Sequence, residues 1–395
     1  MKKILSSALL LLAGLLLSAA ACEIVLRLGG FSAPIWYEAH PELGWSLRPA
    51  AHGWFTTEGR AYSRINTAGF RDRDHAVAKP PLTYRVAVLG DSVPEALQVD
   101  MRASFWWLLQ DKLRACPALA GRAVEVLNFG VSGYGTAQEA LQLETTAIAY
   151  RPDMVLLAFA PNDVRNNSRR LEAEKDRPFF VADGAKLKLD DSFARLAAFK
   201  HRASAPYKAY RSASDWLRIV QLVQAGRHSL EDWRAGLAHA DAGKGMPGFP
   251  GVEPGTDVAA FAPPRNTEWA QAWDVTEQLI ERMHKFSASK GARFVVALLT
   301  HSAQVDPDPL VRKHLQDALG VPDLFYIERR LGALGEHEGF PVIALGPELQ
   351  REAAARKIHF HGFGNYHVGW GHWNEAGHRA AAEIIAPRLC AEASR

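Results

Sequence analysis

Three short apolar runs in this sequence are each followed by a residue suited to acyl-transfer chemistry. These residues are Ser92 after the run 86–89, Gly133 after the run 124–128, and Asn162 after the run 154–158. Acyl transfer needs a nucleophile, a base that takes its proton, and donors aimed at the developing oxyanion. A serine hydroxyl can act as the nucleophile, while a glycine N–H and an asparagine amide can act as the donors.

The base should be a histidine close to the same place, and His372 stands just before the last expected helix. Such a histidine can take the proton of Ser92 and return it to a leaving group. Ser92 also has a second interpretation, because a serine that follows a strand and a tight turn often caps the next helix. Both interpretations place Ser92 at the carboxyl end of a strand.

Apolar runs and helical stretches alternate along most of the chain, which predicts a mostly parallel sheet covered by helices. The expected strands are 86–89, 124–128, 154–158, 293–299 and 341–345, and the expected helices include 103–113, 136–150, 267–290, 309–319 and 375–390. Parallel strands present their carboxyl ends along one edge of the sheet, where ligands bind in open α/β folds. The loops that carry Ser92, Gly133 and Asn162 are therefore expected to converge.

This ordered set of residues resembles the SGNH (GDSL-type) hydrolase superfamily. Ser92 matches the nucleophile of its first sequence block, Gly133 and Asn162 match the oxyanion residues of later blocks, and His372 matches the base. The resemblance covers residues 84–390 apart from one insertion. It implies a flavodoxin-like three-layer α/β/α sandwich and ester hydrolysis without a metal or another cofactor. It also implies an oxyanion hole made by the Ser92 and Gly133 N–H groups and the Asn162 amide.

Two positions depart from the family pattern. Ala160 occupies a position of the third block that is usually glycine, which is a small change. The acid that usually stands two or three residues before the histidine is absent, because Trp370 and Gly369 occupy those positions. The third member of the triad is therefore unknown from sequence. A main-chain carbonyl or an acid from elsewhere in the chain could orient His372.

The composition divides the chain into several parts. Residues 1–28 resemble a signal anchor or signal peptide, because two lysines precede a long uncharged segment. Residues 32–81 are expected to form a β-rich lead-in packed on the main domain, with short strands at 40–45 and 64–71. The hydrolase domain should span 82–395, with an insertion at 164–266 that forms either a substrate wall or an irregular surface excursion.

Within the insertion, residues 178–189 are expected to form a hairpin around Asp183-Gly184, whereas 243–264 reads as a loose Gly/Pro-rich segment. Arg71 in the lead-in is expected to be a solvated turn charge. His359, His361 and His367 lie near His372, but they have no local carboxylate, so they are expected to be surface or pocket-lining groups.

The N-terminus also bears on location. Under the positive-inside rule, Lys2 and Lys3 stay in the cytoplasm and the body is exported to the periplasmic or extracellular side, with the N-terminal segment as its membrane anchor. A cleaved signal peptide and a lipid-modified Cys22 are the alternatives. Export permits disulfides. Cys116 and Cys390 lie near the ends of the first and last helices of the sheet domain, so we expect either a bridge between them or two buried thiols.

The function hypothesis is a serine esterase that removes an O-acyl group, such as acetyl, from an envelope or extracellular carbohydrate or another ester. The alternatives are a polysaccharide O-acetyltransferase and a non-catalytic binding or scaffold protein of the same fold. The formal net charge of +3, with no Lys/Arg run, gives no indication of a nucleic-acid partner.

Overall fold

The computed structural model describes residues 2–183, 186–238, 245–246 and 248–395. Its centre is a five-stranded sheet in the order β13-β12-β7-β5-β6, and all four strand pairs are parallel. The strands are β5 (Thr83–Gly90), β6 (Ala123–Asn128), β7 (Met154–Phe159), β12 (Arg293–Leu298) and β13 (Val342–Ala344). This is the flavodoxin-like strand order. β6 lies on one side of β5, and the later strands β7, β12 and β13 are added in succession on the other side. The expected fold class is confirmed.

Helices cover both faces of the sheet because successive strand residues point to opposite sides. On β5, Ala87 and Leu89 belong to one buried cluster, whereas Val86 and Val88 belong to the other. The first face is covered by α4 (Thr136–Thr145), α9 (Thr267–Ser289), α10 (Pro309–Leu319) and α11 (Tyr326–Glu338). The second face is covered by α3 (Phe105–Leu113), α12 (Gly346–Arg356) and α13 (Glu375–Ala393).

The helix expected at 136–150 is shorter than predicted. It ends as α4 at Thr145, and a separate 3-10 turn follows at Ala147–Tyr150. The Thr145 hydroxyl donates to the Leu141 carbonyl at 2.7 Å, and two β-branched threonines in succession disfavour a further helical turn.

The lead-in consists of two antiparallel hairpins. β1 (Tyr37–His40) pairs with β2 (Gly44–Leu47), and β3 (His52–Phe55) pairs with β4 (Ala61–Arg64). The single strand expected at 40–45 is wrong, because residues 41–43 form the turn between β1 and β2. The strand expected at 64–71 is wrong beyond Arg64. The Asn66 side chain accepts from the N–H groups of Ala68 and Phe70 at 3.0 and 2.8 Å, so this segment closes into a turn.

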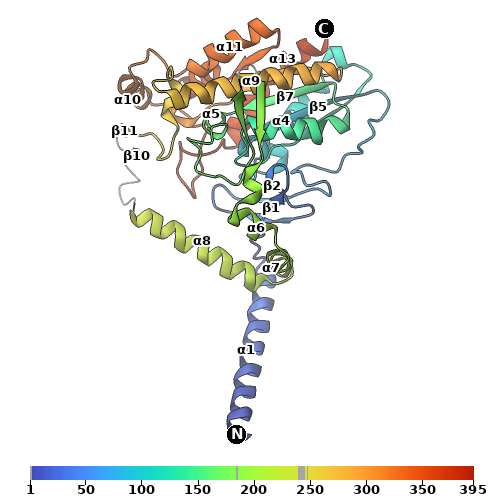
Figure 1. The fold of residues 1–395 in the computed structure, drawn as a ribbon, viewed down its shortest axis with the longest axis vertical. Helices are drawn as coiled ribbons and strands as arrows, with labels where there is room; N and C mark the ends of the chain where they lie inside the picture. Colours follow the sequence, from blue (N-terminus) through green and yellow to red (C-terminus); the bar gives the residue numbers. More distant parts are fainter. Residues whose placement is uncertain (1, 184–185, 239–244, 247) are drawn as a thin grey trace.

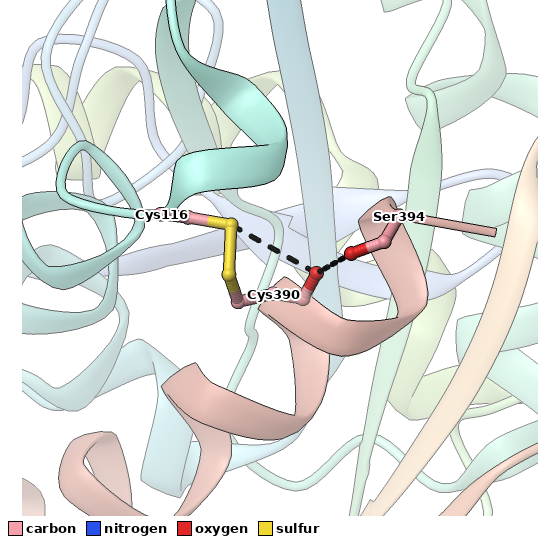
Figure 2. The surroundings of a disulfide bond; sticks show 3 residues. All are labelled: Cys116, Cys390 and Ser394. Atoms are coloured by element: carbon pink, nitrogen blue, oxygen red, sulfur yellow. Dashed lines mark hydrogen bonds between the residues drawn. A yellow bond between two sulfur atoms is a disulfide. The ribbon is translucent and has the colours of Figure 1, made fainter.

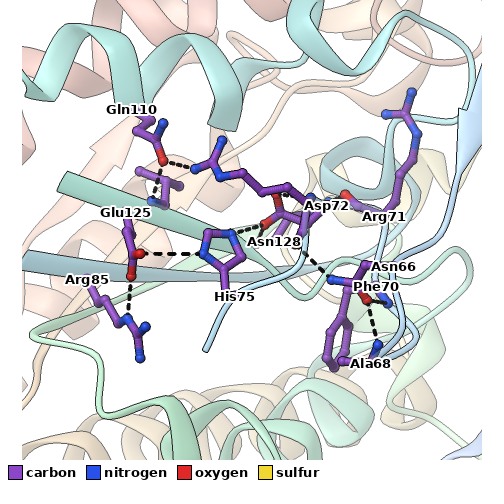
Figure 3. Close-up of polar contacts among 12 residues, drawn as sticks. Asn66, Ala68, Phe70, Arg71, Asp72, His75, Arg85, Gln110, Glu125 and Asn128 are labelled. Carbon is purple, nitrogen blue, oxygen red and sulfur yellow. Dashed lines mark hydrogen bonds and ion pairs between the residues drawn. The ribbon is translucent and has the colours of Figure 1, made fainter. Parts of the chain in front are cut away.

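The end of the lead-in is held against β6 by a buried polar network (Figure 3). The Asp72 carboxylate accepts from the Asn128 N–H at 3.0 Å and lies 3.3 Å from the His75 ring. Arg71 does not carry the solvated charge expected of it, because it has no exposed surface. Its guanidinium donates to the carbonyls of Glu95 and Val99, and burial lowers its pKa to about 10.

The insertion forms its own small set of elements between β7 and α9. They are α5 (Asp163–Asn166), β8 (Phe179–Asp183), β9 (Lys186–Asp190), α6 (Ala197–Ala203), α7 (Ala205–Trp216), α8 (Arg218–Ala238), β10 (Gly245–Met246) and β11 (Phe249–Pro250). β8 and β9 pair antiparallel as expected, although Gly184 at the expected turn lies outside the described residues. Residues 243, 244 and 247 also lie outside them, and the described part of 243–264 is more regular than expected, with β10 paired to β11 and a 3-10 turn at Val258–Phe261.

Helix α1 (Lys2–Leu28) projects away from the body of the molecule (Figure 1). Among the described helices, one segment, Lys3–Leu28, is long and apolar enough to cross a membrane, with a mean hydropathy of 2.5 and none of its apolar stretch buried. Its carboxyl end contacts the insertion, since the Glu23 carboxylate accepts from the Ile219 N–H at 3.0 Å.

Cys116 and Cys390 form a disulfide between the segment after α3 and the end of α13 (Figure 2). The two helices pack side by side on the second face, so the bridge joins the first and last helices of that layer. The bridge that we considered from the sequence is confirmed. Cys22 is a free cysteine.

Candidate active site

Ser92 begins the one-turn helix α2 (Ser92–Glu95), directly beyond the carboxyl end of β5. Gly90 makes this turn possible. It has a φ of +153°, and a Cβ on it would lie 2.8 Å from the Ala158 carbonyl oxygen. Asp91, rather than Ser92, caps the helix, because its carboxylate accepts from the Val93 N–H at 3.1 Å. The Ser92 hydroxyl is therefore not used as a cap.

The Ser92 hydroxyl instead meets His372. The distance between Ser92 Oγ and His372 Nε2 is 2.7 Å, although 280 residues separate them in the chain. Asn374, two residues after this histidine, is the N-cap of α13, because its side chain accepts from the N–H groups of Ala376 and Gly377. The pair thus lies between two regular elements, the end of β5 and the start of α13.

Glu58, a residue that sequence reasoning did not single out, is the acid beside His372. One carboxylate oxygen contacts His372 Nδ1, and the other accepts from the His372 main-chain N–H at 2.6 Å. Glu58 is buried and belongs to the turn between β3 and β4 of the lead-in. Nothing in the segment Thr56-Thr57-Glu58-Gly59 marks it as functional, because its role depends on contact with a loop about three hundred residues later.

Two further contacts hold the loop that carries His372. The Glu253 carboxylate from the insertion accepts from the Gly371 N–H at 2.8 Å. On the other side, the ring of His361 lies 2.7 Å from the Gly371 carbonyl and 3.2 Å from the Thr300 hydroxyl. The peptide groups on both sides of Gly371 are therefore hydrogen-bonded, and this fixes the direction of the His372 side chain.

The charges around His372 determine its protonation. Burial lowers the pKa of the imidazole, but the hydrogen bond and negative charge of Glu58 outweigh burial and raise the pKa above its usual value. Asp91 and Glu253 act in the same direction. The imidazolium that forms when His372 takes a proton is accordingly stabilised.

A cavity of about 280 Å³ opens onto Ser92 and His372. Its wall also contains Asn162, His301 and Thr256. Thr256 belongs to the segment of the insertion that also contains Glu253, so the insertion contributes a wall to the site. Burial lowers the pKa of His301 to about 4, and the imidazole is therefore neutral at pH 7.

Asn162 follows β7 and lines the same cavity as Ser92. Its side-chain nitrogen lies 3.1 Å from an Asp91 carboxylate oxygen and 2.9 Å from the Asn166 amide oxygen. These contacts occupy both amide hydrogens, so donation to an oxyanion requires the amide to release one of them. The longer contact, to Asp91, is the weaker of the two.

Gly133 has a φ of +77°, which favours glycine, and a Cβ on it would lie 3.2 Å from the Trp45 ring. It lines a second, larger cavity rather than the one around Ser92. The residue before it, Ser132, is connected to the turn that carries Ser92, because the Glu95 carboxylate accepts from the Ser132 N–H at 2.9 Å and from the Tyr37 hydroxyl. Burial raises the pKa of Glu95 to about 8.

The remaining histidines of the 358–373 loop have different surroundings. His359 faces Asp306 at 3.9 Å, His361 is buried beneath Gly371, and His367 stacks on Trp370. The described part of the chain contains no group of three or more His, Cys, Asp or Glu residues that could hold a metal ion.

No model of a known protein family matches this sequence, and no curated protein matches it. Solved structures similar to the chain include TesA, at 14% identity and a TM-score of 0.35 over 78% of this chain and 98% of that one. The acetyl xylan esterase AlAXEase is similar at 13% identity and a TM-score of 0.38, over 77% of this chain and 99% of its own. A member of the lipolytic G-D-S-L family from Veillonella parvula is similar at 12% identity and a TM-score of 0.38, over 77% of this chain and 97% of its own. At these identities and TM-scores, no activity is carried over to this chain.

Proposed function

We propose that this chain is a serine esterase that hydrolyses O-acyl esters. The observation that carries the proposal is the continuous line of contacts from Ser92 Oγ to His372 Nε2 and from His372 Nδ1 to Glu58. A buried carboxylate on Nδ1 selects the tautomer in which Nε2 accepts a proton. The hydroxyl next to Nε2 then becomes a nucleophile.

In the first half of the reaction, Ser92 Oγ attacks the ester carbonyl carbon while His372 Nε2 takes the hydroxyl proton. The negative charge moves to the carbonyl oxygen, where the Ser92 N–H and the Asn162 amide, which line the same cavity, would stabilise it. The Gly133 N–H is the proposed third donor, from the neighbouring cavity. The intermediate then breaks the bond to the alcohol oxygen, which receives the proton from His372. The acyl group remains on Ser92.

In the second half, water attacks the acyl-serine carbonyl and gives its proton to His372. Collapse of the second intermediate breaks the bond to Ser92 Oγ, which regains the proton, and the carboxylic acid leaves. The cavity around Ser92, about 280 Å³, favours a short acyl group such as acetyl. An envelope or extracellular carbohydrate as the carrier of this group is supported by the apolar helix α1 and by the disulfide, which is typical of exported proteins.

Transfer of the acyl group to a sugar hydroxyl instead of water is the second candidate function. It uses the same residues for the first half of the reaction. The larger cavity that contains Gly133 favours this candidate, because it offers a place for an acceptor beside the expected oxyanion site. A non-catalytic role is disfavoured by the line of contacts through Ser92, His372 and Glu58.

The test is turnover of p-nitrophenyl acetate by the full chain in detergent. Ser92→Ala and His372→Ala should each lower kcat/KM by at least about 10³-fold. Ser289→Ala and His337→Ala are matched controls on exposed positions of α9 and α11 and should leave turnover unchanged. Wild-type turnover no faster than that of Ser92→Ala would contradict both enzyme functions, whereas acyl label on an added glycan would favour transfer over hydrolysis.

A further inference from the structure

A cavity of about 900 Å³ lies between the lead-in, the Gly133 loop and the insertion. This volume is within the range of roughly 300–1,000 Å³ that is typical of small-molecule sites. Its wall includes the segment 33–39 directly after α1, Trp54 of β3, and Tyr207 of α7. The hydrolytic mechanism uses none of these wall residues, so the kind of ligand that the cavity binds is a separate question.

Arg177 is a buried cation in this wall whose hydrogen-bonding capacity is largely unused. It is 3% exposed, and its guanidinium stacks over the Trp45 ring at 4.9 Å. Its Nε and Nη1 atoms have no hydrogen-bond partner among the described residues. The nearest carboxylate, Glu172, is 4.0 Å away and is shared with Arg165 at 3.1 Å. Buried donors without partners are costly, so a ligand acceptor that reached this guanidinium would be stabilised there.

The other charged groups of the wall are already engaged within the protein. Glu38 pairs with Arg211 at 2.8 Å, and Arg202 pairs with Asp176. The Glu174 carboxylate accepts from the Asp176 N–H at 3.0 Å and retains acceptor capacity. Arg177 and Glu174 together therefore offer one strong donor and one acceptor to a ligand.

Aromatic rings make up much of the remaining wall, namely Trp36, Tyr37, Trp45, Trp54, Phe55 and Tyr207. Flat aromatic faces bury the apolar face of a ring-shaped ligand, while their polar edges stay available for hydrogen bonds. Aromatic walls with a few convergent polar groups are the usual composition of a ligand site.

The cavity adjoins the reacting residues at two points. Gly133, the expected oxyanion donor, lines it, and the Trp45 ring N–H donates to the Ser132 carbonyl at 3.0 Å. Thr56 and Thr57 also line it, and the next residue, Glu58, contacts His372. A ligand held here would thus contact the Gly133 loop directly and would lie against Thr57, the residue before Glu58.

We propose that this cavity binds an acidic sugar of the acylated carbohydrate. The guanidinium of Arg177 would donate to the sugar carboxylate, because arginine matches the planar geometry of that group. A sugar hydroxyl would donate to Glu174, and the ring would lie against Trp45 or Trp54. The inference rests on the proposed esterase function and deepens it by naming an anionic rather than a neutral carbohydrate as substrate.

Binding to the full-length Ser92→Ala protein in detergent tests this assignment, with tryptophan fluorescence as the readout. The probes are a galacturonic acid trimer, a galactose trimer and inorganic phosphate. We expect the acidic trimer to bind at least about tenfold more tightly than the neutral one, and the preference to shrink at high salt. Equal affinities for the two trimers, no binding of either, or tighter binding of phosphate would overturn the proposal.

Variants of Arg177 in the same background make the test specific to this residue. Arg177→Gln should remove the preference for the acidic trimer, and Arg177→Lys should reduce it because the forked donor geometry is lost. Arg330→Gln is a matched control, since Arg330 stacks over Trp273 at 4.7 Å but pairs with Glu277 on another part of the surface. A folded Arg177→Gln protein that keeps the preference would contradict the assignment.

If Arg177→Gln fails to fold, the affinities of the two trimers for the Ser92→Ala protein still test whether the cavity prefers an acidic sugar. Failure of the esterase function is read separately, from p-nitrophenyl acetate turnover by the wild-type chain. That ester is neutral and carries no sugar, so its hydrolysis does not depend on the acidic-sugar assignment.

Discussion

Glu58 supplies His372 with the carboxylate that the histidine's own loop lacks. One carboxylate contacts both the ring Nδ1 and the main-chain N–H of His372, so it constrains the ring orientation as well as its tautomer. The same arrangement raises the pKa of the imidazole, because the nearby negative charge stabilises its protonated form. The protonation of His372 is therefore the property that Glu58 should control.

Replacing Glu58 with Gln tests this control. The base form of His372 is the active one, so kcat/KM should rise with pH through the pKa of the free enzyme and then level off. Loss of the negative charge should lower that pKa, which moves the acid limb of the profile to lower pH. The plateau should also fall, by roughly 10²–10⁴-fold. The measurement is kcat/KM for p-nitrophenyl acetate against pH.

Glu144→Gln is the matched control for this profile, because Glu144 pairs with Arg282 on the surface of α4 and α9. It should reproduce the wild-type curve. An acid limb in Glu58→Gln that coincides with that of the wild type would show that Glu58 does not set the protonation of His372.

The contact between Ser92 and His372 follows from sequence reasoning, because both residues flank elements that end at one edge of a parallel sheet. Glu58 and Glu253 could not be found in this way. Each lies in an irregular segment, and only the tertiary structure brings these segments to the His372 loop. The burial of Arg71 was missed for a related reason, since its partners are main-chain carbonyls that no sequence pattern indicates.

At the scale of elements, the loop before α13 has no room for a side chain at Gly371. This residue has a φ of +73°, and a Cβ on it would lie 2.1 Å from Glu58 Oε1. Gly371→Ala should therefore displace Glu58 from His372 and lower kcat in p-nitrophenyl acetate turnover by at least about tenfold. Gly364→Ala lies in the same loop with nothing within 4 Å of its Cβ and should have no effect. Equal kcat values for the two variants would contradict this packing.

The disulfide joins α3 to α13 across 274 residues of sequence. A bridge that closes so long a segment restricts the unfolded chain, and its loss typically costs about 2–5 kcal/mol. The double variant Cys116→Ser, Cys390→Ser should thus unfold at a lower urea concentration than the wild type. Cys22→Ser is the control, because Cys22 is a free cysteine. Identical midpoints for the wild type and the double variant would rule out a stabilising bridge.

The central strands were predictable because continuous apolar runs such as 86–89 and 154–158 fit strands buried on both faces. Element ends were less predictable. The helix from Thr136 stops at Thr145 through a local side-chain contact, and the strand at Arg64 stops because the Asn66 side chain closes a turn. In both cases a side-chain hydrogen bond to the main chain competes with the backbone hydrogen bonds of the helix or strand.

At the scale of the whole molecule, α1 stands apart from the α/β body while the insertion contacts its end. The Glu23 carboxylate of α1 accepts from the Ile219 N–H at the start of α8, and the Gln221 side chain of α8 accepts from the Ala33 N–H at 2.8 Å. The lead-in that follows α1 carries Glu58, so it connects the expected anchor to the proposed triad. We propose that the body is held close to the membrane surface.

Membrane fractionation tests this location. The full chain should remain with membranes after carbonate extraction, because α1 exposes an apolar stretch long enough to span them. A chain that lacks 1–28 should be released, and it should keep p-nitrophenyl acetate turnover because the apolar stretch of α1 is not buried against the body. Release of the full chain by carbonate would contradict the anchor.

The most direct measurement of the central claim is covalent labelling by a fluorophosphonate, followed by mass spectrometry of the peptide that contains residues 84–95. The claim predicts a single adduct on Ser92, no adduct in Ser92→Ala, and strongly slowed labelling in His372→Ala and Glu58→Gln. Labelling of Ser92→Ala at the wild-type rate, or an adduct on another residue, would contradict the claim that Ser92 is the nucleophile activated by His372 and Glu58.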